Sequence, residues 1–150
     1  MGLKVGDKLP NFSAKDTNGN DFDSKDYLGK QPLVIYFYPK DDTPGCTAQA
    51  CSFRDNYQDF KDLGAEVIGI SSDTVQSHIR FKSKFNLPFI LLSDNTKKLR
   101  KLFGVQNSLF VIPGRETFVI DKNGIVLMVF NSMSSEIHIT KALSVLKKTL

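Results

Sequence analysis

A continuous apolar run, Leu33-Val-Ile-Tyr-Phe-Tyr38, is followed by a helical pattern and then by a second apolar run, Glu66-Val-Ile-Gly-Ile70. Runs of this length without polar alternation are typical of strands buried on both faces of a sheet. Residues 46–63, between the two runs, repeat apolar side chains at helical spacing and end before Gly64, which favours helix termination. This order predicts a parallel β-α-β unit, which constrains the fold more than any other feature.

The remaining pattern extends this unit. Two Asn-Gly pairs, at positions 18–19 and 123–124, each lie between strand-like segments and predict β-hairpins. We therefore expect a single α/β domain over residues 1–150, with a mixed central β-sheet, helices on both faces and an N-terminal β-hairpin. The other expected elements are strands at 9–14, 21–22, 89–92, 117–121 and 125–130, and helices at 74–85, 95–103 and 135–150.

Charge and hydropathy limit the classes of partner. The chain carries 20 Lys and Arg against 16 Asp and Glu, but these basic residues are spread along it. The densest basic group, residues 97–101, has no interleaved aromatic side chain, so we interpret it as a solvated helix face and expect no nucleic-acid binding. A docking surface for an acidic partner protein is the alternative. No apolar run approaches the roughly 20 residues that span a bilayer, so we expect no membrane association.

The only two cysteines, Cys46 and Cys51, follow the first apolar strand closely. Thr43 and Pro44 suit the N-cap and the first position of a helix, so Cys46 is predicted in the first helical turn. Backbone N–H groups and the helix dipole there stabilise an anion, and the thiolate is the reactive form of cysteine. We therefore predict that Cys46 is a nucleophile. The Thr43 hydroxyl is expected to cap the helix, to face the sulfur, or to do both in part.

Cys51 follows Cys46 by five residues. On an α-helix this offset is about 140° of rotation and about 7.5 Å of rise, which places the Cα atoms about 8.6 Å apart. A disulfide requires about 7 Å or less, so the first helical turns must unwind before a Cys46–Cys51 bridge can form. From geometry alone, Cys51 is either the partner of Cys46 in such a redox switch or a small buried core thiol.

Other polar residues give no further site. His78 and His138 lack the spacing of metal ligands, and we expect both on the surface or at helix ends. In the helix expected at 74–85, Ile79 and Phe81 are expected to pack into the core. Asp41 and Asp42 are expected to be solvated loop residues. We predict no metal site and no cofactor.

These residues resemble one known family. Pro39-x-x-x-Thr43-x-x-Cys46 is similar to the peroxiredoxin active-site motif, and Cys51 five residues later resembles the peroxiredoxin Q, or bacterioferritin comigratory protein, subfamily. The resemblance runs from about Val5 to the C-terminal helix and implies a thioredoxin-like fold. Further similar stretches are Cys51-Ser-Phe-Arg-Asp55, Gly64-Ala-Glu-Val-Ile-Gly-Ile-Ser71, Leu87-Pro-Phe89, Leu92-Ser-Asp94 and Pro113-Gly-Arg115-x-Thr117-Phe-Val-Ile-Asp121-Lys-Asn-Gly124.

The resemblance implies a thiol-dependent peroxidase that reduces hydrogen peroxide and organic hydroperoxides in antioxidant defence. Cys46 would be the peroxidatic cysteine, whose thiolate attacks the O–O bond and becomes a sulfenic acid. Cys51 would be the resolving cysteine, forming an intramolecular disulfide that a thioredoxin-type donor reduces. Arg115 would favour the thiolate and polarise the peroxide, with Thr43 bonding the incoming oxygen and Pro39 shielding the pocket. Without the resemblance, Arg115 is interpreted as a surface charge at a turn and Pro39 as a strand terminator.

The resemblance also suggests a monomer. No apolar leader follows Met1, so we expect a cytoplasmic location, or a plastid location if a transit peptide was removed before residue 1.

Two other functions remain as hypotheses. A thioredoxin-like disulfide reductase is disfavoured, since it requires Cys-x-x-Cys. A redox-sensing binding module is suggested by residues 97–101 and by the unwinding that a disulfide would need.

Overall fold

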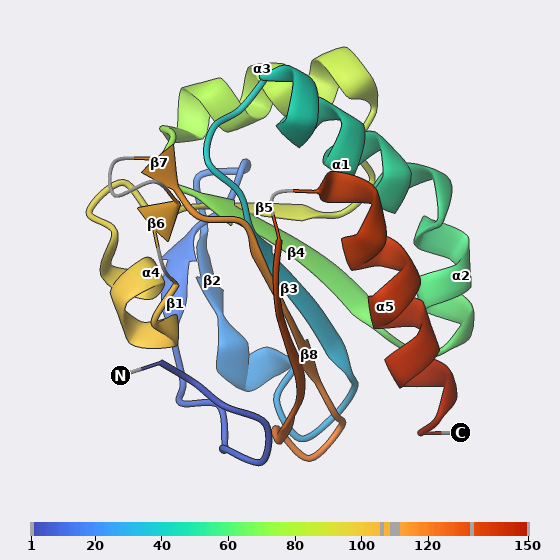
Figure 1. Ribbon diagram of the computed structural model, residues 1–150. Coiled ribbons are helices and arrows are strands. Elements are labelled where there is room, and N and C mark those ends of the chain that lie inside the picture. Colours follow the sequence, from blue (N-terminus) through green and yellow to red (C-terminus); the bar gives the residue numbers. More distant parts are fainter. Residues whose placement is uncertain (1, 106, 109–111, 133, 150) are drawn as a thin grey trace.

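Seven strands form one mixed β-sheet in the computed structural model, which describes residues 2–105, 107–108, 112–132 and 134–149. Their order across the sheet is β2-β1-β5-β4-β3-β8-β9 (Figure 1). The strands are β1 (Ser13–Lys15), β2 (Asp21–Asp23), β3 (Leu33–Phe37), β4 (Glu66–Ser71), β5 (Ile90–Ser93), β8 (Glu116–Ile120) and β9 (Val126–Asn131). A separate short pair consists of β6 (Asn107–Ser108) and β7 (Ile112–Pro113), which the sequence pattern did not predict.

The helices cover the two faces of the sheet unequally. Four of them pack into the core on one face: α1 (Pro44–Asp55), α2 (Tyr57–Asp62), α3 (Val75–Phe85) and α5 (Ser135–Lys147). The other face is covered by the short helix α4 (Lys98–Phe103) together with the N-terminal segment, which includes the 3₁₀ helix η1 (Ser24–Asp26). Figure 1 shows α4 on the opposite side of the sheet from α1, α2 and α5.

The apolar run of β3 explains its central place. Its even-numbered residues pack under α1, α2, α3 and α5, whereas its odd-numbered residues pack on the α4 side. β3 pairs in parallel with β4 and antiparallel with β8, so that Ile35 lies opposite both Ile68 and Phe118. A strand with neighbours on both edges and helices on both faces has no solvated position, which is why the run lacks polar alternation. The predicted mixed sheet with helices on both faces is confirmed.

Both predicted hairpins are present. In the N-terminal hairpin, β1 pairs antiparallel with β2, and the Asp16 side chain accepts the backbone N–H groups of Asn18 and Asn20 at 2.9 and 3.0 Å. In the second hairpin, β8 pairs antiparallel with β9, and the Asp121 side chain accepts two turn N–H groups in the same way. The N-terminal hairpin also extends the main sheet, because β1 pairs antiparallel with β5.

The helix expected over 46–63 divides at Asn56 into α1 and α2. The Asn56 side-chain amide donates to the Ser52 carbonyl at 2.8 Å, and shares this acceptor with the Asn56 backbone N–H at 3.1 Å. Short polar side chains that bond nearby backbone in this way compete with helical hydrogen bonding. The cysteines both fall within α1, as predicted.

The helix expected over 95–103 begins only at Lys98. The Asp94 carboxylate accepts the backbone N–H groups of Leu99 and Arg100, both at 2.9 Å. A carboxylate that binds the first free N–H groups of a helix defines where the helix starts. Within the described residues, the structure contains no helix long and apolar enough to cross a bilayer.

Candidate active site

Cys46 lies in the first turn of α1, which begins at Pro44 with Thr43 in the N-cap position. Its side chain is buried, with only 2% of its surface exposed. The first N–H groups of a helix have no acceptor within the helix, and together with the helix dipole they favour an anion beside them. The predicted position of Cys46 at a helix N-terminus is therefore observed.

Arg115 reaches Cys46 from the segment that leads into β8. Its Nη2 donates to Cys46 Sγ at 3.4 Å, across 69 residues of sequence. Its Nη1 donates to the Gln49 side-chain oxygen, one helical turn after Cys46. Arg115 is buried, so its interpretation as a surface charge is wrong. A guanidinium in contact with sulfur stabilises a thiolate over a thiol, as the helix N-terminus does.

Gln49 is a site residue that the sequence pattern did not single out. It is fully buried on α1, and its side-chain oxygen accepts from Arg115 while its Nε2 has no partner among the described residues. A buried polar side chain needs a hydrogen bond to offset its desolvation, and the guanidinium supplies one here. The spacing of three residues after Cys46 was the available signal, since it places Gln49 on the same helix face.

Thr43 and Pro39 lie on the loop between β3 and α1, and both are half-buried. The Thr43 side chain makes no capping hydrogen bond, so that prediction is wrong. Its hydroxyl donates instead to the Lys40 carbonyl at 3.2 Å, within the same loop. Pro39 follows the end of β3 by two residues, which is compatible with its interpretation as a strand terminator.

Cys51 is a half-buried free thiol in the middle of α1, and Cys46 is a free thiol as well. Since α1 is continuous from Pro44 to Asp55, helix geometry puts the two Cα atoms about 8.6 Å apart. The structure therefore shows the reduced arrangement of the pair. Cys51 is neither fully buried in the core nor in contact distance for a disulfide.

Two predictions about polar residues are wrong. His78 and His138 are buried rather than on the surface, and Asp41 is buried rather than solvated. In α3, His78 takes the inward position, while Ile79, the expected core anchor, is 45% exposed. Asp41 and His78 contact each other, with His78 Nδ1 2.7 Å from Asp41 Oδ2. These two residues and Asp73 form a group of metal-ligating types, but the three side chains already hydrogen-bond within their own network.

His138 lies on α5 beneath the Arg115 segment. Its Nε2 donates to the Ser132 carbonyl at 2.7 Å, and its Nδ1 accepts from the Thr117 hydroxyl at 2.7 Å. We assign this tautomer from the network, since a carbonyl can only accept. Burial lowers the pKa of His138, and the nearby Arg115 charge lowers it further, against the raising effect of the Ser132 carbonyl. The imidazole is therefore neutral at neutral pH.

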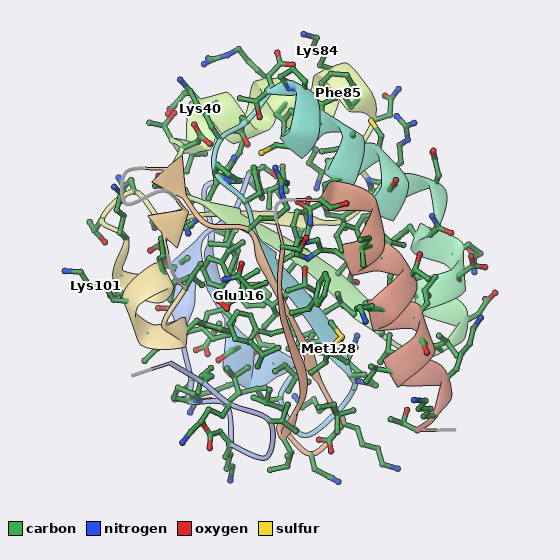
Figure 2. The ribbon with its side chains drawn as sticks, viewed as in Figure 1. Lys40, Lys84, Phe85, Lys101, Glu116 and Met128 are labelled. Carbon is green, nitrogen blue, oxygen red and sulfur yellow. The ribbon has the colours of Figure 1, made fainter. Side chains whose placement is uncertain are left out.

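Arg100 departs from the predicted solvated face at 97–101. Its Nη2 donates to the Tyr38 carbonyl at 3.2 Å and its Nη1 to the Gly114 carbonyl at 3.1 Å, and it is buried. It thus joins the segment before Pro39 to the segment before Arg115. The lysines of 97–101 are exposed as predicted, and Figure 2 shows Lys101 extending away from the fold.

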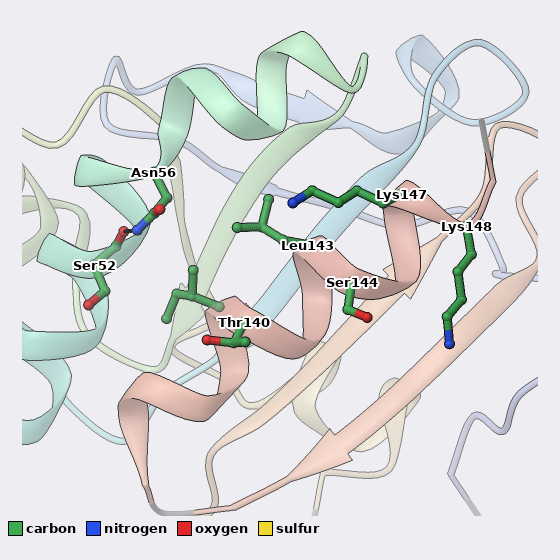
Figure 3. A pocket seen from close by; sticks show the side chains of 8 residues that line it. Ser52, Asn56, Thr140, Leu143, Ser144, Lys147 and Lys148 are labelled. Atoms are coloured by element: carbon green, nitrogen blue, oxygen red, sulfur yellow. Dashed lines mark hydrogen bonds between the residues drawn. The ribbon is translucent and has the colours of Figure 1, made fainter.

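A groove of about 680 Å³ lies between α1 and α5 (Figure 3). Figure 3 shows Ser52 of α1 and Asn56 just after α1 on one side of the groove, and Thr140, Leu143 and Ser144 of α5 on the other. Cys46, Cys51 and Arg115 are not among the residues that line it. The groove is therefore separate from the contact between Cys46 and Arg115.

A buried cysteine at a helix N-terminus, paired with an arginine on a thioredoxin-like fold, defines a thiol-dependent peroxidase. The model of the AhpC/TSA family matches residues 5–129, and the chain belongs to this family, within its peroxiredoxin Q group. The chain is 51% identical to peroxiredoxin Q of Sedum lineare over 144 residues, which are 95% of this chain and 77% of that protein. It is 53% identical to peroxiredoxin Q of Arabidopsis thaliana over 147 residues, which are 97% of this chain and 68% of that protein. Both relatives are described as chloroplastic.

Solved structures agree with this assignment. Peroxidoxin BcpB from Mycobacterium tuberculosis matches with a TM-score of 0.91 at 36% identity, over 99% of both chains. A mutant of Xylella fastidiosa PrxQ also matches with a TM-score of 0.91, at 30% identity, over 99% of this chain and 98% of that one. The thioredoxin-like fold and the thiol peroxidase activity expected from the resemblance are confirmed at the level of the family.

Proposed function

We propose that Cys46 is the peroxidatic cysteine of this peroxidase and Cys51 its resolving cysteine. The observation that carries the proposal is the contact of 3.4 Å between Arg115 Nη2 and Cys46 Sγ at the start of α1. A guanidinium and a helix N-terminus both stabilise the thiolate, which is the nucleophile that cleavage of a peroxide requires.

The reaction proceeds in two steps. The Cys46 thiolate attacks one peroxide oxygen, so that an S–O bond forms, the O–O bond breaks and the sulfur becomes a sulfenic acid. The released hydroxide or alkoxide takes a proton and leaves as water or alcohol. The Cys51 thiolate then attacks the Cys46 sulfur, so that an S–S bond forms, the S–O bond breaks, and the released hydroxide takes a proton and leaves as water. Arg115 stabilises the negative charge that develops on the peroxide oxygens in the first step.

Thr43 and Pro39 complete the proposed site. The Thr43 hydroxyl exchanges its bond to the Lys40 carbonyl for one to a peroxide oxygen. Pro39 has no N–H group, so it presents an apolar surface near the reacting atoms and shields them from water.

The disulfide is returned to two thiols by a thiol reductant, which we propose to be a thioredoxin-type protein. We further propose that residues 1–150 act as one domain and as a monomer, without nucleic acid or membrane. The relatives described as chloroplastic favour the plastid alternative over the cytoplasmic location first expected.

The intact mass of the reduced protein, measured seconds after one equivalent of hydrogen peroxide, tests the two roles. We expect a loss of two hydrogens in the native chain and a gain of one oxygen in Cys51→Ser. Cys46→Ser should show neither change. Peroxide turnover by Cys46→Ser would refute its role, and sustained thioredoxin-driven turnover by Cys51→Ser, with no other thiol present, would refute that of Cys51.

A further inference from the structure

Asp41, five residues before Cys46, is the centre of a buried hydrogen-bond network. Its carboxylate accepts from the Tyr38 hydroxyl at 2.6 Å, from the Ser77 hydroxyl at 2.8 Å and from His78 Nδ1 at 2.7 Å. Its backbone N–H donates to Asp73 Oδ2 at 2.8 Å. These contacts tie the loop between β3 and α1 to three other elements: the end of β3, the end of β4 and α3. None of them belongs to the proposed reaction steps.

His78 has an acceptor on each ring nitrogen. Its Nε2 lies 3.0 Å from the Leu92 carbonyl on β5, which can only accept, so this nitrogen donates. On the other side is Asp41. Burial by itself raises the pKa of Asp41, but the hydrogen bonds from His78, Tyr38 and Ser77 outweigh it, so the pKa of Asp41 lies below its usual range. The ionised carboxylate can only accept, so His78 Nδ1 donates to Asp41 while Nε2 donates to Leu92.

We propose that the Asp41–His78 pair is a positioning device for the peroxidatic loop: it holds the N-terminal end of the segment that unwinds, so that Cys46 returns to the same place in every cycle. The inference rests on the proposed roles of Cys46 and Cys51. The pair touches no reacting atom. It acts through the loop, which carries Thr43 in direct continuity with α1.

The backbone beside the pair supports this role. Asp42 has a φ of 57°, a left-handed conformation that a residue other than glycine keeps where its surroundings hold it. The buried pair next to it provides such surroundings. Among the described residues, the Asp42 carboxylate has one exposed contact, with Lys84 Nζ at 2.8 Å. Figure 2 shows Lys84 and Lys40 at the same end of the molecule, where α3 meets this loop.

The far end of the unwinding segment is held as well. The Phe53 ring stacks on Tyr36 of β3 with centroids 4.4 Å apart, and Arg54 Nη1 donates to the Phe85 carbonyl at the end of α3 at 2.8 Å. A disulfide between Cys46 and Cys51 needs unwinding only between these two fixed points. Loss of the Asp41–His78 pair should misplace the loop in the reduced protein and slow the attack of Cys46 on peroxide. Unwinding of the helix and disulfide formation should not be slowed.

Two substitutions of similar size separate this role from general stability. The amide of asparagine reaches about as far as Nδ1 of histidine, and the amide of glutamine about as far as Nε2, so each keeps one donor of His78. His78→Asn should keep the bond to Asp41, and His78→Gln should keep only the bond to Leu92. We expect His78→Asn to react with peroxide at near the native rate, and His78→Gln to react about tenfold to a hundredfold more slowly, as small misplacements of reacting groups do.

The rate of the first step is measured by rapid quenching and intact mass in a Cys51→Ser background, and the rate of disulfide formation in the two-cysteine chain. His78→Gln should form the disulfide at least as fast as the native chain once Cys46 is oxidised. Lys84→Ala, which breaks the exposed contact between the same loop and the same helix, is the control and should leave both rates unchanged. An exposed ion pair of this kind contributes little.

Equal peroxide rates for His78→Asn and His78→Gln, or an equal loss in both steps for His78→Gln, would overturn the proposal. Should either variant fail to fold, Asp41→Asn, which removes the charge but keeps the shape, must show the same slowing of the first step alone. The native chain is measured alongside. If it does not react with peroxide at all, the proposed function fails; if it reacts and the variants match it, only the positioning role fails.

Discussion

Gly45 lies directly against Arg115: a Cβ atom placed on Gly45 would be 3.1 Å from Arg115 Nη2. This distance is shorter than an ordinary carbon–nitrogen contact, so a side chain here would displace the guanidinium by a few tenths of an ångström. Since the same nitrogen donates to Cys46 Sγ, the glycine in the first turn of α1 allows the arginine to reach the sulfur.

Gly45→Ala should both stabilise the fold and slow the reaction of Cys46 with peroxide. Alanine favours a helix over glycine by up to about 1 kcal/mol, so the free energy of unfolding should rise slightly. The displaced guanidinium should slow the attack on peroxide by about threefold to tenfold. Urea unfolding and the rate of Cys46 oxidation give the two quantities, with Ser52→Ala on the same helix as the control. An unchanged rate of oxidation would show that the position of Arg115 tolerates this shift.

Arg115→Lys should slow the first step by about a hundredfold, the order seen when a preorganised donor to a reacting anion is lost. Lysine keeps the charge but lacks the fork that contacts Gln49 and Cys46 together. The rate of oxygen gain in a Cys51→Ser background measures this step alone. A lysine variant as fast as the native protein would mean that charge is sufficient and that the geometry of the fork contributes nothing.

Gln49→Met should destabilise the fold by about 1–3 kcal/mol, because the Arg115 donor that it accepts would be left buried without a partner. Gln49→Glu, which keeps an acceptor at the same place, is the matched variant and should preserve the stability. Both are compared by urea unfolding, followed by the rate of Cys46 oxidation. If the methionine variant is as stable as the native chain, Arg115 must find another acceptor.

The free energy of unfolding should fall on mild acidification because of His138. Its pKa in the folded chain is lowered from 6.5, mainly by burial, so the unfolded chain takes up a proton first. The contribution of neutral His138 to the free energy of unfolding is fully present above the pKa of the unfolded chain. It is lost as the pH falls from that pKa toward the lower pKa of the folded chain. Urea unfolding between about pH 7.5 and 5.5 should show this decline, and His138→Asn should show less of it. An identical decline in both proteins would assign it to other groups.

The order of elements could be predicted from the sequence because it depends on local patterns. The apolar run at 33–38 is typical of a strand buried on both faces, and the two Asn-Gly pairs indicate hairpins where strands flank them. The place of Cys46 in the first turn of α1 followed from Thr43 and Pro44 in the same way. Each of these signals lies within a few residues of the structure that it specifies.

The contacts between distant residues were not predictable in this way. Arg115 and Gln49 are 66 residues apart and meet only because β8 lies beside β3 in the sheet. The polarity of His78 favours the surface, although its spacing from Phe81 places both residues on one face of α3. That spacing was the available signal. The burial of His78 then depends on Asp41, a partner from another element.

The two members of the contact between Arg115 and Cys46 belong to parts of the fold with different freedom to move. The arginine adjoins a strand of the sheet, whereas the cysteine lies on helical turns that must open before a disulfide can form. If Cys46 and Cys51 pair as proposed, the sulfur moves away and the Arg115 guanidinium loses this contact. The contact stabilises the dithiol form relative to the disulfide form, so it raises the reduction potential of the cysteine pair. In the proposed cycle, the interaction that favours attack on the peroxide therefore also makes the disulfide easier for the reductant to reduce.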